Sequence, residues 1–138
     1  MVTREERDTR QRFAGRYSED RTGVVRQIEL AVIGGDWGAN GYTTMRQADQ
    51  LTAALRLGPG VRLLDLGAGR GWPGLYLAVR TSCQVVLTDV PDEGLRLAMT
   101  RAAAEDATER AVAVVSSARA LPFRAGTFDA VVHTDVLC

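Results

Sequence analysis

Apolar residues are arranged along this chain in two patterns, short unbroken runs and stripes with helical spacing. Four mostly apolar runs, at 61–66, 84–88, 111–115 and 127–133, are typical of strands buried in a parallel sheet. Helices are predicted between these runs, because apolar residues recur there three and four positions apart. Strands that alternate with helices predict an α/β fold built on a parallel sheet.

The residues before the first run predict further helices. Residues 3–17 are charged nearly throughout, as in a surface helix, whereas 22–33 carry a broad apolar side. Thr44 opens a capping-box sequence, which predicts a third helix starting there. We therefore expect an N-terminal helical extension with a glycine-rich loop over 1–43, followed by an α/β unit over 44–138.

The glycine-rich loop before Thr44 carries two aromatic residues, Trp37 and Tyr42. Loops often carry function, so both residues are candidates for a flap over a binding site. Packing against the body of the protein is the alternative, and the sequence leaves both open.

A second glycine-rich stretch, Asp-Leu-Gly-Ala-Gly-Arg-Gly at 65–71, ends the first strand and precedes a helix predicted from Trp72. Glycine adopts the positive φ of a sharp strand-to-helix turn, and the free N–H groups of the following helix point back at the turn. The stretch 69–74 also satisfies the dinucleotide pattern G-x-G-x-x-G. The strand has already closed at Gly67, however, and the acid Asp65 suits a cationic amino-acid end better than a pyrophosphate. A turn that only packs a helix on a strand is the remaining alternative.

The positions Asp65, Gly67, Gly69 and Gly71 resemble motif I of the class I S-adenosylmethionine-dependent methyltransferases. The resemblance, to small-molecule "type 11"-like domains, extends over 44–138. It implies a Rossmann-like sheet in the order 3-2-1-4, S-adenosylmethionine as cofactor, no metal, and methyl transfer to an unidentified acceptor. The cofactor-binding residues that it implies are Asp65, Gly67, Ala68, Gly69, Gly71, Asp89, Val90, Ser117, Ala118 and His133.

Three of these residues raise separate questions. Asp89 lies 22 residues beyond Gly67, where a carboxylate can accept both ribose hydroxyls, although it could instead cap the next helix, a role that Asp92 fits better. Ser117 stands where the family often has an aspartate that accepts from the adenine amino group, and a hydroxyl is a weaker acceptor. His133, the only histidine, either takes a proton from the methyl acceptor or lines the methionine end of the cofactor.

Composition narrows the range of partners and compartments. Seventeen basic residues balance seventeen acidic ones, so no nucleic-acid footprint is visible. Cys83 and Cys138 lack the spacing of a metal site or a disulfide framework, which favours reduced thiols and a cytoplasmic protein. The N-terminus lacks an apolar signal region and no apolar run reaches membrane-spanning length, so we expect no membrane partner.

The resemblance stops partway through the family's fold, so we expect a C-terminally truncated domain. The strand over 128–133 would then form an unprotected edge through which the chain could self-associate. Two alternatives to a methyltransferase remain at this point: an NAD-dependent oxidoreductase and a non-catalytic truncated remnant.

Overall fold

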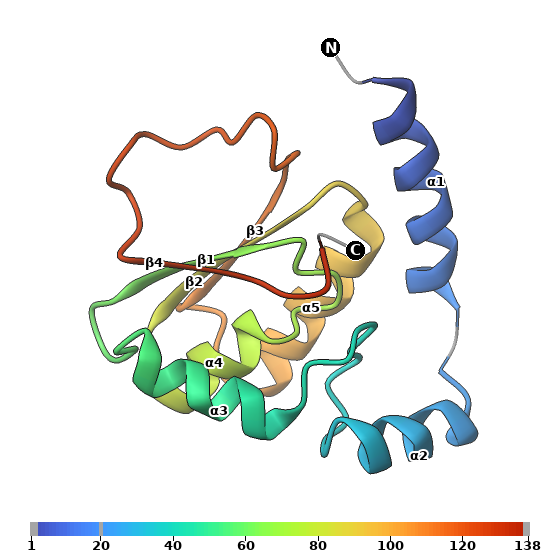
Figure 1. Cartoon of the computed structure of the whole chain (residues 1–138), viewed down its shortest axis with the longest axis horizontal. Coiled ribbons are helices and arrows are strands. Elements are labelled where there is room, and N and C mark those ends of the chain that lie inside the picture. Colours follow the sequence, from blue (N-terminus) through green and yellow to red (C-terminus); the bar gives the residue numbers. More distant parts are fainter. Residues whose placement is uncertain (1–2, 20, 137–138) are drawn as a thin grey trace.

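Four parallel strands form a single sheet in the computed structural model, which describes residues 3–19 and 21–136 (Figure 1). The strands are β1 (Arg62–Leu66), β2 (Gln84–Asp89), β3 (Ala111–Val115) and β4 (Ala130–His133). Their order, β3-β2-β1-β4, confirms the predicted fold class and topology. β4 is shorter than predicted and begins only at Ala130, because Asp129 is still in the preceding loop.

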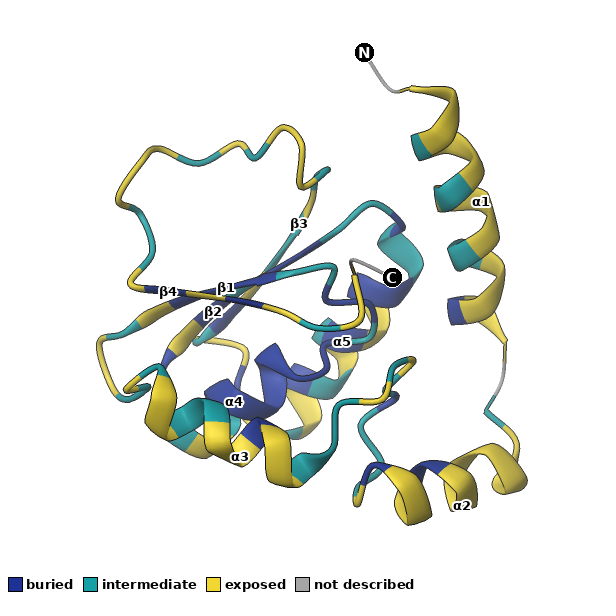
Figure 2. Cartoon of the chain, viewed as in Figure 1, coloured by how far each residue is buried: buried dark blue, intermediate teal, exposed yellow. Residues whose placement is uncertain are grey.

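Three helices lie on one face of this sheet. They are α3 (Met45–Ala54), α4 (Gly74–Thr81) and α5 (Asp92–Ala104). α4 packs on β1 and β2, α5 packs on β2 and β3, and α3 packs against α4. Leu63, Val85 and Leu87 point toward these helices and are buried. Val112 and Val131 point to the opposite face and are 55% and 50% exposed, so the core lies on the helical side (Figure 2).

Two N-terminal helices, α1 (Arg4–Ser18) and α2 (Gly23–Val32), confirm the helices predicted there. α1 packs against α5 and stands beside the carboxyl ends of the strands (Figure 1). α2 turns its apolar side to solvent, and Ile28 is 58% exposed, while Glu29 is buried. The Glu29 carboxylate is held inside by an ion pair with Arg21 and by the backbone N–H groups of Trp37 and Ala39.

Helix starts agree with the sequence only in part. The capping box at Thr44 is confirmed, because its hydroxyl accepts from the backbone N–H of Gln47 and the Gln47 side chain accepts in return. α4 begins at Gly74 rather than Trp72. The prediction that Asp92 caps α5 is wrong, since Asp92 is the first residue of the helix. Its carboxylate forms ion pairs with Arg10 and Arg96 instead. No helix in the described ranges is long and apolar enough to cross a lipid bilayer.

Candidate functional site

A cleft of about 440 Å³ lies at the carboxyl ends of the strands, between them and α1. Its floor comes from residues at or just beyond the ends of all four strands. Five predicted site residues line it: Gly67, Asp89, Val90, Ser117 and Ala118. Ligands of open α/β sheets bind at this edge, so the structure brings these residues together where a ligand is expected.

A smaller cavity of about 70 Å³ adjoins the cleft and shares Phe13, Tyr17, Gly67 and Asp135 with it. Two more of the predicted residues, Ala68 and Gly69, line this second cavity. The two spaces together form an elongated site that follows the glycine-rich turn away from the β3 end.

The glycine-rich turn has the backbone that its sequence requires. Gly67 and Gly69 adopt positive φ values of 71° and 52°, and a Cβ on Gly69 would lie 2.9 Å from the Tyr17 hydroxyl oxygen. The Gly69 N–H donates to the Asp89 carboxylate at 2.8 Å. The turn is therefore fixed against the end of β2 and leaves no room for a side chain at position 69.

Asp89 is the acidic group of the cleft floor. Its second oxygen accepts from the backbone N–H of Val90 at 2.7 Å, and the side chain of Tyr17 also hydrogen-bonds to it. Burial raises the pKa of Asp89, and the hydrogen bonds partly offset this. The pKa of Tyr17 is raised to about 12, mainly by burial and secondly by the negative charge of Asp89. A carboxylate has about four acceptor positions, so Asp89 has capacity left for a ligand hydroxyl.

Asp65 lies beneath the turn, 1% exposed, and does not line the cleft. One of its oxygens accepts from the N–H of Gly74, the first residue of α4, at 2.8 Å, and the other is buried without a partner. Burial raises its pKa well above the ordinary value of 3.8. Asp65 therefore anchors the start of α4, and its predicted contact with the cofactor stays a prediction.

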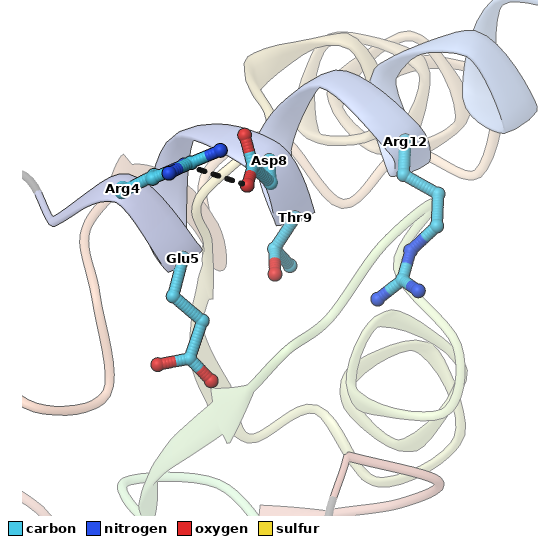
Figure 3. A pocket seen from close by; sticks show the side chains of 5 residues that line it. All are labelled: Arg4, Glu5, Asp8, Thr9 and Arg12. Atoms are coloured by element: carbon cyan, nitrogen blue, oxygen red, sulfur yellow. Dashed lines mark ion pairs between the residues drawn. The ribbon is translucent and has the colours of Figure 1, made fainter.

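The roof of the cleft is α1, which the sequence reading treated as a surface helix. Glu6, Thr9, Phe13 and Tyr17 line the cleft and lie three or four positions apart, on one side of the helix. That helical spacing is the signal in the sequence that could have placed α1 over the site. Figure 3 shows Glu5, Thr9 and Arg12 projecting from one side of α1, where they line a hollow with Arg4 and Asp8. Because that hollow is lined by α1 alone, the cleft beneath it is the better candidate site.

Contacts at both ends hold α1 over the cleft. At its N-terminal end, the Ser117 hydroxyl donates to the Glu6 carboxylate at 2.7 Å, and Arg119 pairs with Glu5 at 3.1 Å. At its C-terminal end, the Arg70 guanidinium donates to three backbone carbonyls. Arg70 belongs to the glycine-rich turn, so the turn also fixes the roof.

Other predicted residues lie outside the two cavities. His133 is exposed at the end of β4, and its predicted role is untested. Gly71 is buried, where an added Cβ would meet Ala98 and Leu75, and it packs α4 against α5.

The two aromatic residues of the N-terminal loop behave differently. Trp37 packs on Trp72 and Tyr76, with ring centroids 6.2 and 5.2 Å away, which confirms packing for Trp37. Tyr42 is 84% exposed and does not line either cavity. The alternative that its side chain packs against the body of the protein is therefore wrong.

The walls of the cleft have unsatisfied polar capacity that a nucleoside-type ligand could use. Asp89 retains acceptor positions in the cleft, whereas the unpartnered Ser116 hydroxyl oxygen is buried behind the cleft surface. Within 3–19 and 21–136, no three His, Cys, Asp or Glu side chains gather as a metal would require. The residues present therefore fit a ligand that carries hydroxyl and amino donors.

Residues 63–138, more than half of the chain, match a family described as a methyltransferase domain. The 27-O-demethylrifamycin SV methyltransferase of Amycolatopsis mediterranei is 33% identical over 88 residues, which cover 64% of this chain and 32% of that protein. The chain spans about a third of the length of the curated relatives that it matches.

Solved structures give the same picture. A SAM-dependent methyltransferase from Geobacter sulfurreducens, in complex with S-adenosyl-L-homocysteine, is 31% identical with a TM-score of 0.50, over 54% of this chain and 30% of that one. The [4+2]-cyclase SpnF covers 91% of this chain and 48% of its own, with a TM-score of 0.66. At 24% identity, that second likeness is one of fold alone.

Proposed function

The chain belongs to the methyltransferase-domain family, and from this premise we propose that its cleft binds S-adenosylmethionine for methyl transfer to an acceptor. The observation that carries the proposal is the position of Asp89. Its carboxylate faces the cleft at the end of β2 and is joined to the glycine-rich turn by the Gly69 N–H. A carboxylate placed there can accept the two ribose hydroxyls of the cofactor.

The rest of the elongated site suits the two ends of that cofactor. The turn around Gly67 and Gly69 leaves backbone, without side chains, beside the smaller cavity, which would take the methionine end. Ser117 and Ala118 line the cleft at the end of β3, beyond Asp89, and would take the base. The Geobacter relative, crystallised with S-adenosyl-L-homocysteine, supports this assignment.

The chemistry asks little of the protein beyond binding. Bound S-adenosylmethionine supplies a methyl group that its own sulfonium charge has already activated. The side chains of this chain would contribute by holding the two reactants in line and by excluding water. The α1 roof, fastened at both ends, would shield the cleft from solvent.

The family match favours this function over the NAD-dependent oxidoreductase that the second glycine pattern also permits. The acceptor is left open in the proposal, since the substrate named for the Amycolatopsis relative is that protein's own. We include a cytoplasmic location in the proposal, supported by the free, buried thiol of Cys83.

A ligand panel tests the proposed function. We expect S-adenosylmethionine and S-adenosylhomocysteine to raise the melting temperature and NAD to leave it unchanged. At a hundredfold excess over Kd, a bound ligand adds about 2.7 kcal/mol to the free energy of unfolding, which thermal-shift measurements resolve easily. Stabilisation by NAD alone would contradict the proposal.

A further inference from the structure

The α1 helix places the carboxylate of Glu6 at the β3 end of the cleft, where the strand ends themselves supply no acidic side chain. Glu6 lines the cleft together with Ser117 and Ala118, 111 and 112 positions further along the chain. The Ser117 hydroxyl donates to one Glu6 oxygen at 2.7 Å, and the backbone N–H of Thr3 donates to the other at 2.9 Å. These two hydrogen bonds fix the carboxylate plane at the β3 end of the cleft.

From this arrangement we propose that Glu6 is the residue that recognises the adenine amino group of the cofactor, and this inference rests on the proposed function. If Asp89 holds the ribose, the base extends past the end of β2 toward β3, where Glu6 faces Ser117 and Ala118. The amino group of adenine is a donor with two hydrogens. The carboxylate accepts hydrogen bonds from Ser117 and Thr3 and, with about four acceptor positions, has capacity left for this donor.

The neighbouring polar groups are less suited to this role. The Ser117 hydroxyl has its single proton committed to Glu6 and also accepts from the Arg119 N–H at 3.2 Å. Glu5, the other carboxylate of the roof at this end, is paired with the Arg119 guanidinium at 3.1 Å. Glu6 stays ionised, because hydrogen bonds from Thr3 and Ser117 lower its pKa.

A charged acceptor at this position sets the choice of base. Adenine presents a donor at its exocyclic position, whereas hypoxanthine presents a carbonyl oxygen, which a carboxylate repels. Glu6 should therefore select adenine over hypoxanthine through one hydrogen bond to an ionised group, roughly a 10- to 100-fold difference in affinity. The same carboxylate fastens α1 to Ser117, so base recognition and closure of the roof share one residue.

The test compares the Kd of S-adenosylhomocysteine with that of S-inosylhomocysteine, its hypoxanthine counterpart, by calorimetry. The variant is Glu6→Gln, which keeps the shape of the side chain and an oxygen for Ser117 but adds a donor. We expect the preference for the adenine ligand to fall at least tenfold in this variant. The matched control, Glu5→Gln, alters the neighbouring contact to Arg119 and should leave the ratio of the two Kd values unchanged.

A second variant separates recognition from simple anchoring of the helix. Adding Ser117→Asp to the Glu6→Gln protein returns a carboxylate to the same end of the cleft, and the preference for adenine should return with it. An equal loss of both ligands in Glu6→Gln, with the ratio preserved, would show that Glu6 only anchors α1 and would overturn the inference. Failure of the unaltered protein to bind S-adenosylhomocysteine at all would overturn the proposed function, and the inference with it.

Discussion

At the scale of single residues, two aspartates with raised pKa values have separate tasks. Asp89 faces the cleft and joins β2 to the glycine-rich turn, whereas Asp65 is enclosed beneath that turn and joins β1 to α4. The sequence predicted both as acids of one cofactor site. Only burial, which depends on the packed structure, distinguishes the one that faces a ligand from the one that holds the fold.

The role of Asp89 in binding can be measured directly. The Asp89→Ala substitution should weaken the binding free energy of S-adenosylhomocysteine by about 1.5–3 kcal/mol, since hydrogen bonds to an ionised acceptor would be lost. Isothermal titration calorimetry gives the Kd. Asp92→Ala is the matched control, three residues away, where the carboxylate pairs with Arg96 and Arg10 outside the cleft floor. Equal losses of affinity in the two variants would contradict the assigned role.

Asp65 should make the unfolding free energy depend on pH. Its pKa in the folded protein is raised above the ordinary value of 3.8, so ionising this carboxyl group is less favourable in the folded protein than in the unfolded chain. The contribution of Asp65 to stability should therefore be undiminished below about pH 3.8 and decrease as the pH rises toward the folded pKa. The Asp65→Asn variant has no carboxyl group to ionise at this position, so it lacks this decrease. Its free energy of unfolding, compared with that of the unaltered protein at the same pH, should therefore rise as the pH rises.

Urea unfolding of both proteins at intervals from pH 4 to pH 8 would measure this difference. The control is Asp106→Asn, an exposed position with φ of 52°, which asparagine tolerates. Parallel pH profiles for Asp65→Asn and the unaltered protein would show that the buried carboxyl group does not titrate as described.

At the scale of elements, the sequence predicted local structure well and remote contacts poorly. The runs around Leu64 and Val86 and the capping box at Thr44 are local patterns, and each element formed where expected. The placement of α1 over the cleft depends instead on contacts such as Glu6 with Ser117, which no local pattern encodes. Similarly, the apolar side of α2 faces solvent because Glu29 binds loop N–H groups from Trp37 and Ala39.

The contact between the glycine-rich turn and α1 gives a prediction at this scale. Arg70 donates to the backbone carbonyls of Arg16, Tyr17 and Glu19, which a helix end would otherwise leave unpaired. In Arg70→Ala, amide hydrogen exchange within α1 should speed up roughly 10- to 100-fold, because the charged donor is lost. Arg80→Ala, at an exposed arginine of α4, is the control. Unchanged protection of α1 would show that the roof is held by other contacts.

At the scale of the whole molecule, the fold class and strand order followed from alternation of strands and helices, together with the resemblance of the glycine-rich turn to a known family. What the sequence could not give was the identity of the roof, because α1 is held over the site by residues that lie far from it in the sequence. The floor of the cleft comes from strand ends, whose order is dictated by topology. The roof comes from a helix whose position is set by a few polar contacts.

The open edge of the sheet leads to a prediction for the 138-residue chain studied by itself. In the described part of the chain β4 pairs only with β1, and Val131 is 50% exposed on the face that lacks helices. No Lys, Pro or bulge blocks this edge, so its backbone groups can pair with a second copy. We propose that the chain self-associates through β4 and shows no measurable methyl transfer in that form. Sedimentation velocity at several concentrations should show larger species as the concentration rises.

A substitution at the edge distinguishes strand pairing from general stickiness. Val131→Lys places a charge on β4 that a second strand would have to bury, so it should shift the population toward monomer. Leu97→Lys, at a 45% exposed apolar position on α5, removes a comparable apolar side chain away from the edge and should leave association unchanged. If both variants reduced association alike, nonspecific apolar contact would explain it. If the unaltered chain were a monomer at every concentration and methylated an acceptor, the proposal that it self-associates through β4 would be wrong.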